Sequence, residues 1–214
     1  MTFMEQVKVS ISIIIPVYNN LSFTQRCLKS LYLSLVAETL PPSFEVIVVD
    51  NGSCDGTREW IEEFRKSGKP QSELIYHFHE TNLGFAKACN AGAGRTSGKY
   101  LIFLNNDTEV LGDALQKLVR TTEENPGAGI VGCRLLYPNG TIQHAGMVLD
   151  PNLNWLHVFR GYPAGHPAVL ERKTFQAVTG ACFLISRELF IQVEKFDEGY
   201  LNSYEDVDLC FKVR

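Results

Sequence analysis

The 214-residue sequence lacks an apolar run long enough to cross a membrane. The longest such stretch, Ile11 to Val17, contains Ser12 and Pro16 and falls far short of the ~20 residues that a spanning helix needs. Residues 1–10 also lack the basic segment and apolar segment of a secretory signal. We therefore expect a cytoplasmic protein with no transmembrane segment.

Clusters of positive charge are missing as well. The net charge is −4, and lysine and arginine are scattered along the chain, so nucleic acid is not an expected partner. The six cysteines form no CxxC pair and no cysteine–histidine cluster at metal-ligand spacing. We expect them to be reduced and buried as small apolar residues. They are Cys27, Cys54, Cys89, Cys133, Cys182 and Cys210.

The sequence does contain 45% hydrophobic and 21% charged residues, which is typical of a globular chain with one core. Apolar runs rich in β-branched residues alternate with stretches of helical periodicity, and this alternation predicts β-α-β crossovers and a mostly parallel sheet. The predicted strands are residues 9–15, 44–49, 74–78, 100–104 and 182–186. The predicted helices contain residues 28–35, 60–64, 85–95, 113–125 and 187–193.

Three local patterns add detail. A possible capping box, Ser22 to Gln25, predicts that the first helix has Ser22 as its N-cap, and Pro41-Pro42 stops the pattern of that helix. Leu135 to Ile142 predicts a hairpin around Asn139-Gly140. Residues 150–170 are rich in proline and glycine and are predicted to form one long irregular loop, a type of segment that often binds or covers a ligand.

Three predicted strands end in small or acidic polar residues. These segments are Pro16 to Asn20, Asp50 to Ser53, and Asn105 to Asp107. In an open α/β sheet, ligands bind beyond the carboxyl ends of the strands, so we expect the three segments to meet at one site. Two of the segments also have a purely structural explanation. The second is typical turn sequence, and in the third Asp107, or Thr108 after it, suits a helix cap.

The residue types in these segments suggest a phosphate-bearing ligand. Asp50 can accept a hydrogen bond from a base edge or a ribose hydroxyl, and Gly52 allows a close backbone approach. Asn82 to Gly84 opens a predicted helix whose free amides favour an anion, and Lys87 adds a positive charge, although a helix cap beside a solvated lysine would give the same pattern. A carboxylate such as Asp107 suits Mg²⁺ held also by substrate phosphates.

Taken together, these motifs resemble the family 2 inverting glycosyltransferases of the GT-A fold. The NND and EDVDL segments look most like the rhamnosyltransferase-like branch that builds bacterial cell-surface polysaccharides. The resemblance covers essentially the whole chain and implies an α/β fold with a mostly parallel central sheet, flanking helices and a small antiparallel part. The matching motifs are SIIIPVYNN (12–20), EVIVVDNGSCDGT (45–57), NLGFAKACNAG (82–92), YLIFLNNDTEV (100–110), VTGACFLISRELF (178–190) and FDEGYLNSYEDVDLCFKVR (196–214).

The resemblance implies one GT-A domain over residues 1–214, with a nucleotide-binding half at 1–107 and an acceptor-side half at 108–214. Because family members usually continue past the acidic motif, we expect this domain to be truncated at its C-terminus. The implied donor is a UDP- or dTDP-sugar, the cofactor Mg²⁺ or Mn²⁺, and the acceptor a glycan or a lipid-linked sugar. A lipid-linked acceptor would allow peripheral association with the inner face of a membrane, although no basic amphipathic helix supports it directly.

The resemblance also assigns residues. Asp107 matches a metal ligand of the family's DxD site, but Asn105 stands where an acidic residue is common, which puts the metal affinity in doubt. Gly180 and Ala181 match a segment that faces the acceptor and the sugar, and Glu205 is a candidate to position the acceptor. The residues at nucleotide-sugar-binding positions are Pro16, Tyr18, Asn19, Asp50, Asn51, Gly52, Asn82, Gly84, Lys87, Asn105 and Asn106.

Asp206 matches the family's catalytic base. Inversion requires a carboxylate on the face opposite the leaving group to take the proton of the acceptor hydroxyl, which supports this role chemically. On a helix, Glu205 and Asp208 would share a face while Asp206 points away from both. An acidic helix N-terminus explains the same cluster without catalysis, and Asp208 could act as a cap or pair with Lys212 or Arg214.

Two other functions remain open at this stage. An NAD-dependent dehydrogenase would need a GxGxxG motif after the first strand, where this chain has Pro16 to Asn20. A non-catalytic nucleotide-sugar-binding module is favoured by Asn105. The histidines are expected to be surface or strand residues rather than ligands, and His144 is the one to test. They are His77, His79, His144, His157 and His166.

Overall fold

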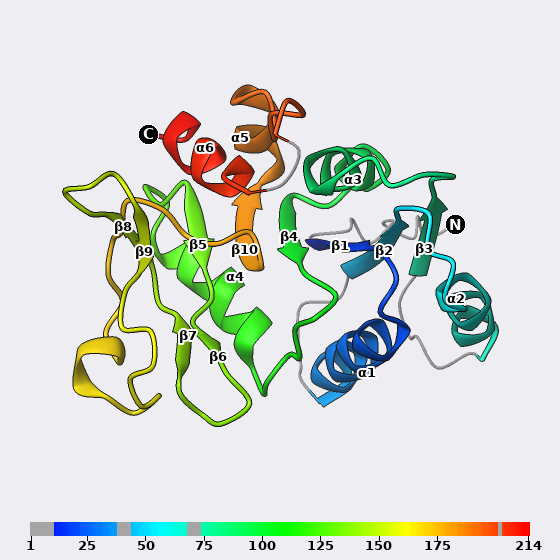
Figure 1. Ribbon diagram of the computed structural model, residues 1–214, viewed down its shortest axis with the longest axis horizontal. Helices are drawn as coiled ribbons and strands as arrows, with labels where there is room; N and C mark the ends of the chain where they lie inside the picture. Colours follow the sequence, from blue (N-terminus) through cyan, green and yellow to red (C-terminus); the bar gives the residue numbers. More distant parts are fainter. Residues whose placement is uncertain (1–10, 38–43, 68–73, 201–202) are drawn as a thin grey trace, which may run out of the picture.

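The computed structural model describes residues 11–37, 44–67, 74–200 and 203–214. A six-stranded sheet with the order β3-β2-β1-β4-β10-β5 forms its centre (Figure 1). The first four of these strands are parallel to one another, whereas β10 runs antiparallel to both β4 and β5. The predicted α/β class with a mostly parallel sheet is therefore confirmed. The strands are β1 (Ile11–Val17), β2 (Phe44–Asp50), β3 (Leu74–Phe78), β4 (Tyr100–Leu104), β5 (Ile130–Gly132) and β10 (Cys182–Ser186).

Helices cover both faces of this sheet, which explains why its central strands are apolar on both sides. One face packs against α1 (Leu21–Ala37), α2 (Thr57–Lys66) and α4 (Ala114–Glu124). The other face packs against α3 (Phe85–Ala93), α5 (Arg187–Gln192) and α6 (Glu205–Lys212). Along β1, Ile13 and Ile15 point to the first set of helices and Ile14 to the second, as the alternation of strand side chains requires.

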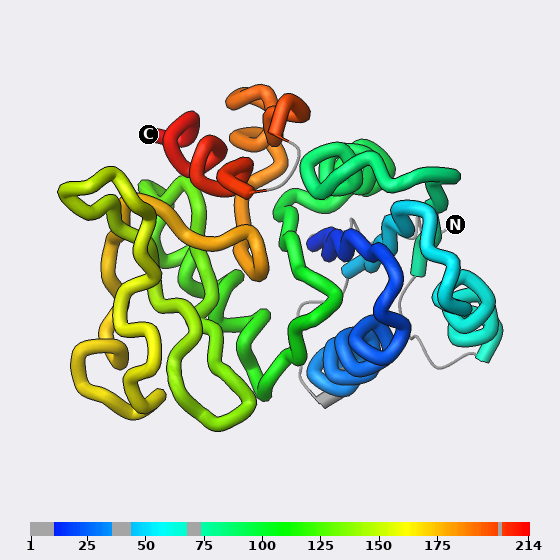
Figure 2. Tube along the Cα trace, viewed as in Figure 1, coloured from blue at the N-terminus to red at the C-terminus, as the bar shows by residue number. Residues whose placement is uncertain are grey.

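Small antiparallel pairs lie beside the β5 end of the sheet (Figure 2). Strands β6 (Leu135–Leu136) and β7 (Ile142–His144) form the predicted hairpin, and Gly140 in its turn has a φ of 81°. Strand β8 (Met147–Leu149) pairs with β9 (Trp155–His157). The prediction of one irregular loop over residues 150–170 is therefore wrong, because that range contains β9 and a short 3-10 helix, Pro167–Val169.

Two further expectations need correction. Ser22 lies inside α1 rather than before it. The helix is capped instead by Asp55, in the loop after β2, which accepts a hydrogen bond from the Leu21 N–H at 2.8 Å. Among the cysteines, all of which are free, Cys54 is exposed and Cys133 is half-buried, while the others are buried as expected. Residues 9, 10, 41 and 42 lie outside the described residues. Within the described ranges, no helix combines the length and apolar character needed to cross a membrane.

Candidate active site

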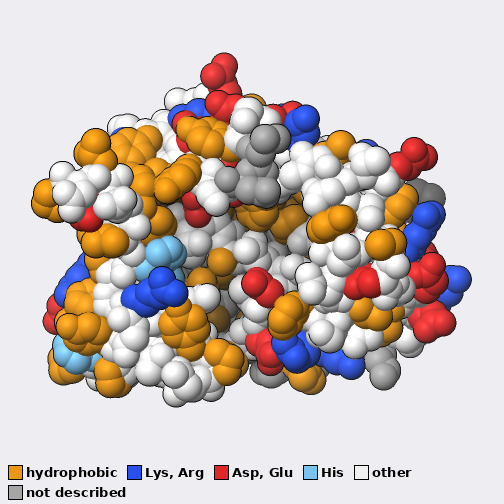
Figure 3. Space-filling view, in the orientation of Figure 1, with side chains coloured by type: hydrophobic (Ala, Val, Ile, Leu, Met, Phe, Trp, Pro, Cys, Tyr) orange, Lys and Arg blue, Asp and Glu red, His pale blue; other side chains and the backbone are white. Residues whose placement is uncertain are grey.

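The candidate site lies at the edge of the sheet where β1, β2 and β4 end. The final residues of β1 and β2 are register partners, Val17 with Asp50. Because β10 is antiparallel to β4, the residues that precede β10 reach this same edge, and Cys182 pairs with Leu104. The space-filling view shows a hollow on this face of the molecule, bordered by acidic and histidine side chains (Figure 3).

The loops after β1 and β2 are joined by hydrogen bonds. The Asn19 N–H donates to Ser53 Oγ at 2.7 Å, and the Cys54 N–H donates to Asn19 Oδ1 at 2.9 Å. Asn19 has a φ of 54°, a left-handed conformation that asparagine tolerates better than most residues. Pro16 is buried at the end of β1, whereas the side chain of Tyr18 is 47% exposed. Of these residues, Tyr18 is the one whose ring is free to contact a ligand.

Asp50 is fully buried and has a fixed orientation. Its Oδ1 accepts the Ser53 N–H and its Oδ2 accepts the Tyr76 hydroxyl, both at 2.8 Å. Burial, and the hydrogen bond to this carboxylate, raise the pKa of Tyr76, so the phenol stays protonated and remains a donor. Each carboxylate oxygen can accept a second bond, so these two contacts do not exhaust the acceptor capacity of Asp50.

Asn51 and Gly52 connect the end of β2 to the start of α3. Asn51 Nδ2 donates to the Gly84 carbonyl at 3.0 Å, and Asn51 Oδ1 lies 2.9 Å from His79 Nδ1. Gly52 has a φ of 85°, and a Cβ there would lie 3.1 Å from the Glu80 carbonyl oxygen. The close approach that Gly52 permits in this structure is therefore to the protein's own backbone.

The start of α3 combines the N-terminal amides of a helix with an exposed lysine. Gly84, with a φ of 89°, is the N-cap, and its N–H donates to Asn82 Oδ1 at 2.9 Å. The side chains of Asn82 and Lys87 are exposed, and Lys87 forms no ion pair with any described residue. This arrangement has the charge and the free amides that an anion requires.

The Asn105 to Asp107 segment contributes oxygen atoms to the same edge. The side-chain Oδ1 of Asn105 is buried and has no hydrogen-bond partner, and Asp107 is exposed with no hydrogen bond or ion pair to a described residue. Asn106 Nδ2 donates to Thr24 Oγ1 at 3.0 Å, which orients this segment against α1. A free carboxylate and an orphaned amide oxygen fit a hard divalent cation that takes its remaining ligands from water and phosphate. The described residues contain no cluster of three acidic, histidine or cysteine side chains that could bind a metal alone.

Asp206 lies in the first turn of α6 and is held by two backbone amides. Its Oδ2 accepts the Gly180 N–H at 2.7 Å and its Oδ1 accepts the Val207 N–H at 2.8 Å. Ala181, which follows Gly180 in the chain, accepts the Asn105 N–H through its carbonyl oxygen at 2.9 Å. Gly180 and Ala181 therefore link the Asn105 segment to Asp206, as one site requires.

The other two acids of α6 point elsewhere. Glu205 is buried, its Oε2 has no hydrogen-bond partner, and burial followed by the charge of Asp206 raises its pKa. Asp208 forms the expected pair with Lys212 at 2.8 Å. The three neighbouring acids thus have separate environments, and the carboxylate of Asp206 is the one bound to the Gly180 amide.

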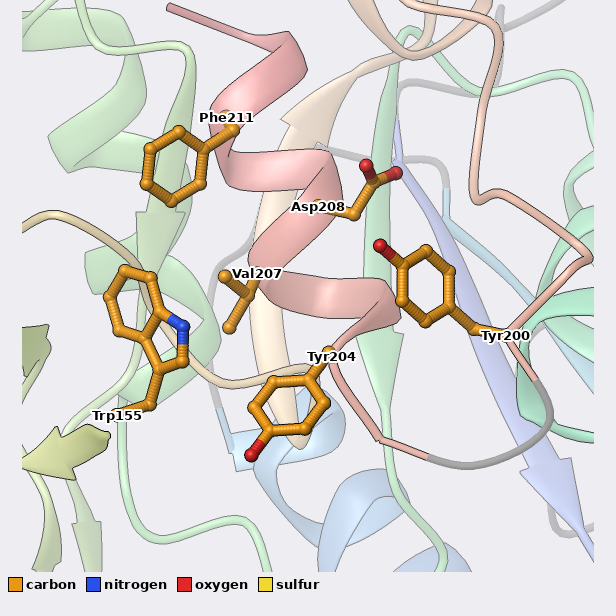
Figure 4. A pocket seen from close by; sticks show the side chains of 6 residues that line it. All are labelled: Trp155, Tyr200, Tyr204, Val207, Asp208 and Phe211. Carbon is orange, nitrogen blue, oxygen red and sulfur yellow. The ribbon is translucent and has the colours of Figure 1, made fainter. Parts of the chain in front are cut away.

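An open cavity of about 400 Å³ lies on another face of α6 (Figure 4). Tyr204, Val207, Asp208 and Phe211 follow the spacing of one helix face, and Tyr200 directs its hydroxyl end toward Asp208. Asp206 does not line this cavity. The lining residues are Trp155, Tyr200, Tyr204, Val207, Asp208 and Phe211.

Sequence comparison decides the family. Residues 12–193 match the sequence profile of the family described as "Glycosyl transferase family 2". The chain belongs to glycosyl transferase family 2. It is 32% identical over 196 residues to the O-antigen biosynthesis protein RfbC of Myxococcus xanthus, an alignment that covers 87% of this chain and 15% of that protein. The predicted family is therefore confirmed.

The fold of this family 2 chain is shared with solved glycosyltransferases, which confirms the predicted GT-A fold. GalNAc-T7 with UDP, GalNAc and Mn²⁺ superposes with a TM-score of 0.73 at 20% identity, covering 98% of this chain and 41% of that one. The mannosyltransferase PcManGT from Pyrobaculum calidifontis, in complex with GDP-Man and Mn²⁺, gives a TM-score of 0.69 at 19% identity, covering 97% and 52%. The family 2 chain thus spans about half or less of the length of each of these proteins.

Sequence reasoning missed a histidine pair in this family 2 chain. His144, at the end of β7, is only 1% exposed, and its Nδ1 lies 2.9 Å from Nδ1 of His157, at the end of β9. Burial, with a smaller contribution from His157, lowers the pKa of His144 to about 3. The two residues lie 13 positions apart on separate short hairpins, and no sequence periodicity indicates that they meet.

The buried His144 predicts a pH-dependent stability. As the pH falls through the ordinary value of 6.5, His144 takes up a proton in the unfolded chain but stays neutral in the folded one until about 3. The free energy of unfolding should therefore decrease by up to ~1.4 kcal/mol per pH unit below 6.5. Urea unfolding between pH 7 and 5 measures this slope. The His144→Asn variant should show a shallower slope, and equal slopes would contradict the assignment.

Proposed function

We propose that this chain transfers a sugar from a nucleoside-diphosphate sugar, a UDP- or dTDP-sugar, to a hydroxyl of a glycan or lipid-linked acceptor, with inversion. The principal support is a set of hydrogen bonds that connects Asp206 to Gly180, and Ala181 to Asn105. Asn105 is two residues from Asp107, and Asp50 lies at the same edge of the sheet. The O-antigen name of RfbC supports a role in cell-surface polysaccharide synthesis. A cytoplasmic location and the lack of a nucleic-acid partner stay predictions.

The nucleotide is assigned to the half of the chain before Asp107. Asp50, fixed by Ser53 and Tyr76, accepts a hydrogen bond from the base or the ribose, and Tyr18 offers an exposed ring. The amides at the start of α3 and the free Lys87 lie in the segment proposed to bind the diphosphate. Residues 108–214 form the acceptor-side half of what we infer to be one domain.

Asp107, together with the unpartnered Oδ1 of Asn105 two residues earlier, would hold the divalent cation, Mg²⁺ or Mn²⁺. Both solved relatives described above contain Mn²⁺. When bound, such an ion acts as a Lewis acid that neutralises charge on the departing diphosphate. With one carboxylate rather than two in the segment, this site is expected to bind the ion mainly together with the nucleotide.

Asp206 is the proposed base. The acceptor hydroxyl donates its proton to this carboxylate while its oxygen attacks the anomeric carbon, and the bond to the nucleoside diphosphate breaks on the opposite face. The Gly180 and Val207 amides fix the direction of the carboxylate before the acceptor binds. This prior orientation reduces the entropy that is lost when the transition state forms. Glu205 is proposed to help position the acceptor.

A donor screen tests this proposal. Thermal shifts are measured with UDP-, dTDP- and GDP-sugars, each with Mg²⁺, Mn²⁺ or chelator, and NADH serves as the control for a dehydrogenase. We expect stabilisation by a sugar nucleotide that depends on the metal, and none by NADH. Because Asn105 also favours a module that binds without turnover, the best ligand is then incubated with the chain and the release of free sugar is measured. Release supports the transferase, whereas binding without release supports the module.

A further inference from the structure

The His144–His157 pair has a defined hydrogen-bond direction. The Thr179 N–H points to His144 Nε2 at 3.4 Å, a long hydrogen bond that makes Nε2 an acceptor. A neutral imidazole then carries its proton on Nδ1, so His144 Nδ1–H donates to His157 Nδ1 across 2.9 Å. By the same rule, His157 carries its proton on Nε2. The hydrogen bond from one backbone amide therefore fixes the tautomers of both rings and leaves one N–H, on Nε2 of His157, outside the pair.

Burial keeps both rings neutral, as this hydrogen-bond chain requires. His144 is almost fully buried, and burial lowers its pKa to about 3. Burial also lowers the pKa of His157, and the nearby positive charge of Arg160 acts in the same direction. The carboxylate of Asp206 opposes this shift, so its charge is felt at the His157 ring. Asp206 is therefore close enough to the half-buried His157 for its charge to act on the ring.

The pair and the base are held by consecutive amides. Thr179 N–H orients His144, and the next amide, Gly180 N–H, donates to Asp206 Oδ2. No described residue accepts a hydrogen bond from His157 Nε2. Arg160 cannot fill this role, because a guanidinium has donors but no acceptor, and its Nε donates to the Tyr137 hydroxyl at 2.8 Å. Among the described residues, the Nε2–H of His157 is therefore a fixed donor without an acceptor, within electrostatic reach of the carboxylate of the proposed base.

We propose that His157 Nε2–H binds a hydroxyl of the acceptor next to the one that reacts, and that His144 is a positioning residue that fixes this tautomer. The inference rests on the proposed transferase function and deepens it. A carboxylate and an N–H donor together select a pair of neighbouring hydroxyls, of which one donates to Asp206 and the other accepts from His157. That pattern fits the vicinal hydroxyls of a pyranose ring, so we infer a saccharide acceptor, whereas a serine or threonine side chain has only one hydroxyl.

The tautomers are tested first, by nitrogen-15 NMR of the histidine rings at neutral pH. The expected spectrum has a proton on Nδ1 of His144 and on Nε2 of His157, with both rings neutral. In His144→Asn, whose amide can replace the Nδ1 donor, His157 should keep its tautomer, whereas in His144→Leu it should become a mixture. The opposite tautomers, or a charged ring in the parent chain, would overturn the proposal without bearing on the transferase function.

Saccharide binding is tested next, with p-nitrophenyl pyranosides of glucose, galactose, mannose, rhamnose and N-acetylglucosamine, with and without UDP and Mn²⁺. At least one should shift the His157 ring signals and saturate. Its affinity should fall roughly tenfold in His157→Leu and His144→Leu, and by less than about threefold in His157→Gln, which retains a donor near the Nε2 position. UDP affinity should stay constant in all variants.

The outcomes separate the two proposals. If no pyranoside shifts His157, or if the leucine variants bind as the parent does, the acceptor assignment is wrong even when UDP binds. If pyranosides bind at His157 but no nucleotide stabilises the chain, the donor side of the transferase proposal fails while the saccharide site stands.

Discussion

Asp206→Asn should lower turnover by at least ~10² while leaving nucleotide affinity unchanged. The amide has nearly the same shape as the carboxylate but cannot take a proton from the acceptor hydroxyl. Both carboxylate oxygens accept backbone N–H groups in the parent, from Gly180 and Val207, so the asparagine must give up one of these bonds. That loss costs about 1–3 kcal/mol of stability, which is smaller than the ~5–15 kcal/mol that stabilises an ordinary domain.

The measurement is the rate of sugar release from the donor found in the screen, together with nucleotide affinity by calorimetry. Asp208→Asn is the matched control, because Asp208 is on the same helix two residues later but pairs with Lys212. We expect turnover of the control to remain within about threefold of the parent. Equal turnover in Asp206→Asn and the parent would remove Asp206 from the mechanism.

The central sheet was predictable because both of its faces are covered. A strand buried on both sides has a continuous run of β-branched and aromatic residues, and the bounds predicted for residues 74–78, 100–104 and 182–186 agree with β3, β4 and β10. Strand β9 was missed because three residues, Trp155–His157, are too few to show a period. Its position depends on pairing with β8 and on the packing of Trp155 against Val207 and Cys210.

The site was predictable at the level of segments but not of contacts. Polar residues after three parallel strands must meet at one edge, and this rule brought the segments of Asp50 and Asp107 together. The segment of Gly180 reaches the same edge only because β10 is antiparallel, a direction that the run of residues 182–186 does not encode. The hydrogen bonds from Tyr76 to Asp50 and between His144 and His157 join residues on different elements, so their geometry depends on the folded chain.

Asp107→Ala should abolish the effect of Mn²⁺ on nucleotide binding. Asp107 is exposed and forms no hydrogen bond or ion pair with a described residue, so its removal should change the free energy of unfolding by less than about 0.5 kcal/mol. The nucleotide, by contrast, should lose at least about tenfold in affinity when Mn²⁺ is present, because no second carboxylate in the segment can replace the lost ligand. Calorimetry measures the nucleotide affinity of the variant and of the parent, each with and without Mn²⁺.

Two further variants make the metal assignment specific. Glu109→Ala removes an equal charge two residues away, where Glu109 pairs on the surface with Arg26 at 3.0 Å, and it should leave the Mn²⁺ effect intact. Asn105→Asp supplies the second carboxylate that the segment lacks, in place of the amide whose oxygen has no hydrogen-bond partner in the parent, and it should strengthen the Mn²⁺ effect. If the parent binds nucleotide equally well with and without Mn²⁺, Asp107 is not a metal ligand, and the charge of the diphosphate must be balanced by Lys87 and the amides at the start of α3.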